Sequence, residues 1–196
     1  YLGPIIRLTQ GQKVRINFHN QLPEESITHW HGLHVPADMD GHPKHAIGYG
    51  ETRVYEFEVL NRASFNIYHP HPHGKTASQV YYGLAGGLII NDSEEARLGL
   101  PSGEFEIPLV IQVNGRPKAE LDLATRAYRF RIMNGSDARI YKLGWSNGAP
   151  ITVIGVDGGL LEKPETRPYV MLAPGERLDV WADFSGYARG TEMTLR

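Results

Sequence analysis

Two His-x-His pairs lie about forty residues apart in this chain: His29 and His31 in T-H-W-H-G-L, and His69 and His71 in Y-H-P-H-P-H-G. In an extended strand successive side chains point to opposite faces, so residues i and i+2 point the same way. Each pair therefore places two imidazoles on one side of a strand, and two such strands side by side would bring four imidazoles around a metal site. Imidazole binds copper, zinc, iron and nickel, so the spacing does not identify the metal. The alternative is that the pairs belong to histidine-rich surface loops that bind nothing.

Strands are the elements that the local patterns predict. Apolar and polar residues alternate with a period of two at 14–18 and at 55–59, as expected for half-buried strands. Apolar runs at 88–90 and 151–154 predict strands that are more fully buried. The 22 glycines and 13 prolines supply frequent turn signals, and a short helix is expected only from Ser93 to Leu98. The expected fold class is all-β, a β-sandwich or barrel.

The chain is long enough for two domains. Its 196 residues suffice for one large domain or for two of about 100 residues each. The segment 91–108 contains acidic residues, proline and glycine, which favour a boundary there. We therefore expect a first domain at 1–92, a linker at 93–107 and a second domain at 108–196.

A second set of strands is expected beyond this boundary, at 128–133, 139–143, 151–156 and 178–184. The turn segments T-Q-G-Q (9–12) and A-P-G-E (173–176) each precede an alternating strand. This rough analogy favours two similar sandwiches.

Composition excludes several classes of protein and site. The formal charge of −2 gives no reason to expect nucleic acid or an anionic membrane as a partner. No apolar run approaches the ~18 residues of a membrane span. The chain begins at Tyr1 without a signal peptide, as a processed exported chain also would. With no cysteine, disulfides, cysteine-based metal sites, cysteine nucleophiles and a blue-copper centre are excluded.

The wording of the histidine motifs resembles the first cupredoxin domain of the multicopper oxidases, which include laccases and bacterial cuprous oxidases. The matching segments are H-W-H-G-L-H-V-P at 29–36, Y-H-P-H-P-H-G-K-T at 68–76, Gln79 and G-L-A-G-G-L at 83–88. Three later segments are similar to the middle domain of that family: N-G-S-D-A-R at 134–139, D-G-G-L-L at 157–161 and L-A-P-G-E-R at 172–177. The resemblance implies two cupredoxin-like Greek-key β-sandwich domains.

The resemblance also implies a role for each paired histidine. His29 would bind the type 2 copper, and His31, His69 and His71 would bind the type 3 pair. Together these coppers form the cluster that reduces dioxygen to water. The other five histidines are not expected to be ligands; they are His19, His34, His42, His45 and His73.

The chain departs from the family pattern in several places. The H-P-x-H-x-H and H-C-H motifs of the third cupredoxin domain do not occur, so we expect that domain and the type 1 copper site to be absent from this chain. Tyr1 resembles a late start, and a segment is expected to be missing between Gln112 and Val113. We expect such a chain alone to bind copper incompletely and to be inactive without the C-terminal domain as a partner.

The leading hypothesis is part of an oxidoreductase that couples one-electron oxidation of phenolic or metal-ion substrates to reduction of dioxygen. The family implies a periplasmic or secreted location. One alternative is a non-catalytic copper-binding or scaffold protein on the same fold. Another is a two-domain copper protein with its site between subunits, although such proteins need a cysteine for the type 1 copper.

Overall fold

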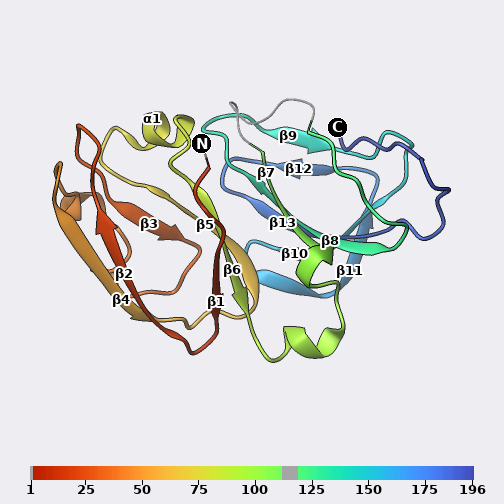
Figure 1. Ribbon diagram of the computed structural model, residues 1–196, viewed down its shortest axis with the longest axis horizontal. Helices are drawn as coiled ribbons and strands as arrows, with labels where there is room; N and C mark the ends of the chain where they lie inside the picture. The colour runs from red at the N-terminus through yellow and green to blue at the C-terminus, as the bar shows by residue number, and fades with distance from the viewer. Residues whose placement is uncertain (1, 112–118) are drawn as a thin grey trace.

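A computed structural model describes residues 2–111 and 119–196, and nearly all of the regular structure within them is β-strand (Figure 1). The all-β expectation is confirmed. The expected missing segment between Gln112 and Val113 lies outside the described residues. The helices are short, and none in the described ranges is long and apolar enough to cross a lipid bilayer.

The first half of the chain forms two sheets. One has the strand order β1-β6-β5-β3, with the bounds Ile6–Thr9, Gly86–Asn91, Ser64–Pro70 and Thr28–His31. Strand β1 pairs with β6 in parallel, and the other two pairs are antiparallel. The second sheet is the antiparallel pair of β2 (Lys13–His19) and β4 (Thr52–Glu58), the two segments predicted from their alternation. The connections contain the short helices η1 (Pro43–His45) and α1 (Thr76–Tyr81).

Burial in β4 follows the period of two in its sequence. Tyr55 and Phe57 are buried, whereas Glu56 and Glu58 are exposed. The buried aromatic rings pack with Trp30 of β3 in an apolar cluster that joins residues of both sheets. The two sheets form a sandwich because each has an apolar face that the other covers.

The second half forms a five-stranded sheet in the order β11-β10-β13-β8-β7 and a two-stranded sheet of β9 and β12. In chain order the bounds are β7 Glu106–Ile111, β8 Ala127–Asn134, β9 Tyr141–Leu143, β10 Ile151–Val156, β11 Gly159–Arg167, β12 Val170–Leu172 and β13 Arg177–Asp183. A second apolar cluster, which includes Phe130, Val153 and Leu172, joins these two sheets. The buried strand predicted at 151–154 is confirmed within β10.

Two local expectations need correction. The strand expected at 139–143 begins only at Tyr141, because the carbonyl of Arg139 accepts a hydrogen bond from the Asn134 side chain (2.7 Å). The helix expected from Ser93 is a 3-10 helix, η2 (Glu95–Leu98), which ends at Gly99 with φ 62°. So short a segment favours the tighter 3-10 form over an α-helix. A further 3-10 helix, η3 (Gly103–Phe105), precedes β7.

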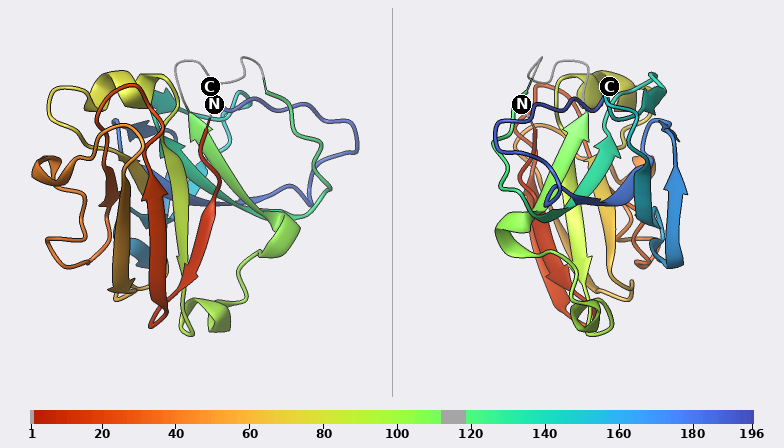
Figure 2. Two further views of the ribbon diagram at one scale, coloured as in Figure 1. Left: turned by 60° about the vertical axis from the view of Figure 1, so that its left-hand side comes forward. Right: turned by 90° about the vertical axis from the view of Figure 1, so that its right-hand side faces the viewer.

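A third apolar cluster, the middle core, lies between the two halves. It joins Phe65 and Ile67 of β5 to Met133 of β8. Because Phe65 and Ile67 are two residues apart, they mark the face of the first sheet that meets the second half. The ion pair between Arg7 Nη1 and Glu106 Oε2 (2.7 Å) crosses the same boundary. The strands of the first half, red to yellow, lie beside those of the second half, green to blue, in Figure 1, and the view turned by 90° shows the second half in front of the first (Figure 2).

Strand β8 contributes a buried ion network to the face that also carries Met133. Arg129 and Arg131 are only 3% and 0% exposed. Arg131 donates from Nε to Glu106 Oε1 (2.5 Å) and from Nη2 to Glu95 Oε1 (2.8 Å). Arg129 donates from Nε to Asp179 Oδ1 (2.8 Å). The network ties η2 and β7 to the centre of the five-stranded sheet.

Candidate metal centre

Strand pairing brings the two histidine motifs together. Strands β3 and β5 are antiparallel neighbours, and their register sets His29 directly opposite His69. His31 lies two residues from His29, and Trp30 between them is buried in the core of the first half. The predicted alternation is therefore present: the imidazoles lie on one face of β3 and the indole on the other.

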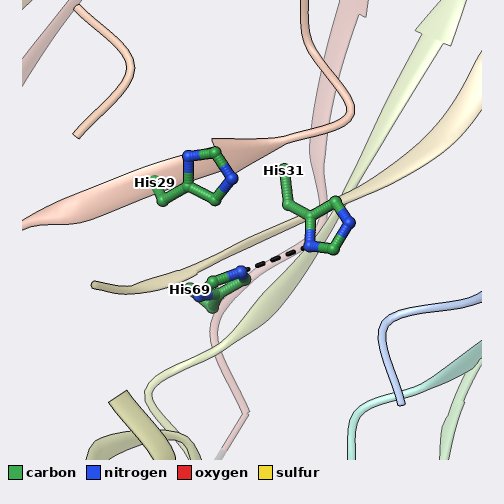
Figure 3. A group of neighbouring side chains, drawn as sticks. All are labelled: His29, His31 and His69. Carbon is green, nitrogen blue, oxygen red and sulfur yellow. Dashed lines mark hydrogen bonds between the residues drawn. The ribbon is translucent and has the colours of Figure 1, made fainter. Parts of the chain in front are cut away.

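Three imidazoles form a compact group. One ring nitrogen from each of His29, His31 and His69 lies within 4.8 Å of the others. His31 Nδ1 and His69 Nε2 are 3.3 Å apart and face each other, with the His29 ring beside them (Figure 3). All three side chains are partly buried. This spacing allows one small cation to be reached by nitrogen atoms from two strands.

The His71 ring lies beside this group, but its nitrogens do not belong to the set within 4.8 Å. It follows the last residue of β5, and its backbone N–H donates to the Ile27 carbonyl (2.9 Å). Its ring stacks on that of His29 with a centroid separation of 5.0 Å. The structure thus brings all four predicted imidazoles together, three of them as a single set of potential ligands.

Backbone carbonyls determine which nitrogen of these rings carries the proton. The Nδ1 atom lies close to a carbonyl oxygen in His29 (Asp40 O, 2.8 Å), His69 (Pro70 O, 2.9 Å) and His71 (Gly41 O, 3.3 Å). A carbonyl can only accept, so Nδ1 is the donor in each ring, and the neutral ring keeps its lone pair on Nε2. A metal-binding imidazole usually has such a partner on its other nitrogen.

The surroundings of His31 and His69 favour the neutral form of these two imidazoles. Burial lowers the pKa of His69 to about 4; the Pro70 carbonyl opposes this shift, and neighbouring imidazoles add to it. Burial, with a smaller contribution from Arg177, also lowers the pKa of His31. Neutral imidazole is the form that binds a metal ion. The donor set therefore suits copper, for which imidazole is a usual ligand.

The depressed pKa of His69 predicts that the stability of the metal-free chain depends on pH. Between about pH 4 and pH 6.5 the unfolded chain binds more protons than the folded chain, so the free energy of unfolding rises with pH. The free energy of unfolding reaches its full value above about pH 6.5, and up to about 3 kcal/mol of it is lost as the pH falls to about 4. Urea unfolding with a chelator present should reveal this slope. The variant His69→Gln should flatten it and the exposed-site variant His73→Gln should not; equal slopes in all three proteins would contradict the assignment.

The remaining histidines lie outside the group. His19, His34, His42 and His73 are exposed, and His45 is partly buried in η1. None of these belongs to a cluster of three potential ligands within the part of the chain that the structure describes.

Sequence reasoning assigned no role to two segments that contact the imidazoles. One is the loop at Asp40 and Gly41, whose carbonyls accept from His29 and His71. The only signal for it was the D-G dipeptide, which is typical of a turn. The other is the turn at Gly175, next to His31; its sequence was identified as a turn before a strand and as part of a segment similar to the family's middle domain, with no role at the histidines.

Known proteins share this arrangement of strands. A family profile described as multicopper oxidase matches residues 1–95. The multicopper oxidase mco of Staphylococcus aureus is 34% identical over 94% of this chain, which spans 47% of that relative. The crystal structure of the multicopper oxidase McoA from Aquifex aeolicus is similar with a TM-score of 0.90 and 38% identity, over 98% of this chain and 50% of that one.

The chain is also similar to the cell division protein FtsP of Xenorhabdus nematophila. It is 32% identical over 94% of this chain, which spans 45% of it. The chain thus covers about half the length of each of these relatives.

Proposed function

Because this chain belongs to the multicopper oxidase family, we propose that it supplies the first-domain histidines of the copper cluster at which dioxygen is reduced to water. His29 is the proposed type 2 ligand, and His31, His69 and His71 are the proposed type 3 ligands. The observation that carries this proposal is the group of three imidazole nitrogens within 4.8 Å of one another. The proposed domains are 1–92 and 108–196, joined by 93–107, each a cupredoxin-like β-sandwich.

The chain's own groups prepare the site for copper. The carbonyls of Asp40, Pro70 and Gly41 accept the Nδ1 protons of His29, His69 and His71 and so leave the lone pair of each neutral ring on Nε2. Burial lowers the pKa of His69 and of His31, which favours the neutral form of these two rings at neutral pH. Copper bound there would supply one-electron redox chemistry toward dioxygen.

Electrons must enter such a cluster through another centre. The chain has no cysteine, so it contributes no thiolate to a type 1 copper. We propose that a C-terminal cupredoxin domain, present in the half of the relatives that this chain does not span, supplies the type 1 copper and the remaining cluster ligands. Its reductants would be small phenols or metal ions, and the proposed location is the periplasm or cell exterior.

Copper binding by the purified chain tests the proposal. Copper affinity is measured by competition with a chromophoric chelator, and copper content by elemental analysis. His69→Gln should weaken binding more than about 100-fold, since loss of outer-shell partners alone costs about 10- to 100-fold. His73→Gln, at an exposed histidine four residues away, should bind like the parent. A parent chain that binds no copper, or a His69 variant that binds as well as the parent, would refute the assignment.

A non-catalytic scaffold is the second candidate, and the similarity to FtsP favours it. Dioxygen uptake by the whole copper-loaded protein with a phenolic dye separates the two candidates. Uptake supports the oxidase; copper binding without uptake supports the scaffold.

A further inference from the structure

The face of the first sheet that carries the histidines is the face that meets the second half. Phe65, Ile67 and His69 follow one another at intervals of two along β5, so their side chains point to the same side. Phe65 and Ile67 belong to the middle core, and His69 is paired across the sheet with His29. The imidazole group therefore lies at the end of the middle core, where the second half can touch it.

The turn between β12 and β13 makes that contact at Gly175. A Cβ atom built on Gly175 would lie 3.1 Å from Cε1 and 3.7 Å from Nδ1 of His31. The turn is held in place by two backbone hydrogen bonds: Gly175 N–H donates to Asn134 O (2.9 Å), and Glu176 N–H donates to Ala173 O (3.0 Å). The backbone of Gly175 therefore lies against the edge of the His31 ring, and a side chain at this position would require the ring to move by a few tenths of an ångström.

One buried guanidinium connects this turn to the strand that carries His69. Arg177 is 4% exposed; it donates from Nη1 to Gly175 O (2.8 Å) and from Nε to Phe65 O (2.9 Å). Its Nη2 also donates to Asp157 O (3.1 Å). The guanidinium is planar, so its donors lie in a fixed geometry. The backbone of Gly175, which lies against His31, and strand β5, which carries His69, are thus both hydrogen-bonded to one rigid guanidinium.

The backbone of Gly32, the residue after His31, also lies close to this guanidinium. A Cβ atom built on Gly32, at φ +99°, would lie 2.8 Å from Arg177 Nη2 and 2.4 Å from Asn66 Oδ1. His31 is therefore confined by Gly175 at its ring and by Arg177 at the neighbouring backbone.

We propose that Gly175 and Arg177 of the second half are positioning residues for His31, which fix its ring relative to His69 and so set the spacing of the metal ligands. The proposal rests on the proposed copper site. It assigns to the second half a direct part in building a centre to which this chain contributes ligands only from its first half.

A matched pair of glycines allows a direct test. Gly175 has φ +80° and touches His31, whereas Gly11, in the analogous T-Q-G-Q turn, has φ +81° and nothing within 4 Å of a built Cβ. Alanine at either position meets the same left-handed backbone strain, so any difference between the variants comes from the contact with His31. Asparagine tolerates this backbone better, so the pair Gly175→Asn and Gly11→Asn serves where the alanine variants fold poorly.

Two readouts report on the His31 ring. The first is the ¹⁵N and ¹³C imidazole resonances of His31 in the chelator-treated chain, and the second is the Cu(II) electron paramagnetic resonance spectrum with the copper affinity. Gly175→Ala should shift the His31 resonances, change the spectrum and weaken copper binding about 10- to 100-fold, while Gly11→Ala leaves all three unchanged. Arg177→Lys should change the same signals, because a lysine ammonium cannot span the carbonyls of Gly175 and Phe65 as the guanidinium does.

The outcomes separate this inference from the proposed function. A parent chain that binds no copper refutes the proposed function and with it the metal role of these residues. A parent that binds copper, with Gly175 variants whose His31 resonances and copper spectrum match those of the Gly11 variants, refutes the positioning role alone.

Discussion

Arg131→Met is expected to lower the free energy of unfolding by about 3–5 kcal/mol, the cost of removing one partner from a buried ion pair. Arg131 is fully buried, and its guanidinium binds Glu106 and Glu95. Burial by itself would raise the pKa of Glu106, but Arg131 and Arg7 hold that pKa below its ordinary value. Without Arg131, buried carboxylates lose their main counterion, and methionine offers them no hydrogen bond.

Urea unfolding at pH 7 measures this loss, and a surface ion pair provides the control. Arg15 Nη1 lies 2.5 Å from Glu56 Oε1, but both side chains are more than half exposed. Arg15→Met should therefore cost only about 0–1 kcal/mol. If the two variants lose the same stability, the network around Arg131 does not stabilise the fold as its burial indicates.

Gly41→Ala is expected to cost about 2–5 kcal/mol and to weaken copper binding as well. Gly41 has φ +74°, and a built Cβ would lie 1.9 Å from the Thr28 carbonyl oxygen and 2.8 Å from the His29 backbone nitrogen. The left-handed backbone costs about 1–2 kcal/mol for a residue with a side chain, and overpacking adds about 1–3 kcal/mol. The loop must then move away from β3, and the carbonyls that accept from His29 and His71 move with it.

Gly50→Ala is the matched control for the loop variant. Gly50 has φ +79° and nothing within 4 Å of a built Cβ, so alanine there meets the backbone strain alone. Thermal unfolding and copper titration should show a small loss of stability and unchanged affinity for Gly50→Ala, and a loss of both for Gly41→Ala. Unchanged copper affinity in Gly41→Ala would show that the Asp40–Gly41 loop does not orient the imidazoles.

The sequence predicts that the two histidines of each pair point to the same side, because this depends on a local rule. Residues at i and i+2 share a strand face, which holds for His29 and His31 in any extended strand. The register that sets His29 opposite His69 is a pairing of distant segments, which no local pattern determines. Sequence reasoning grouped His71 with the other three imidazoles; that its nitrogens lie outside the compact set, just beyond the end of β5, also depends on this distant pairing.

The buried charges could not be predicted from the chain locally. In A-Y-R-F-R-I-M the arginines alternate with apolar residues, a pattern typical of a strand with one face in water. Arg129 and Arg131 are buried because Glu95 and Asp179, far away in sequence, compensate their charge. Likewise, A-P-G-E at 173–176 predicts a turn, and only the packing of the two halves places this turn next to His31.

The middle core has a consequence for how the molecule melts. Phe65 and Met133, one from each half, are at most 3% exposed and share one cluster. Separating the halves would expose this apolar surface to water and break the Arg177–Phe65 hydrogen bond, so we expect each half to be less stable alone than in the intact chain. Thermal unfolding should therefore melt the two described sandwiches together, in one cooperative transition.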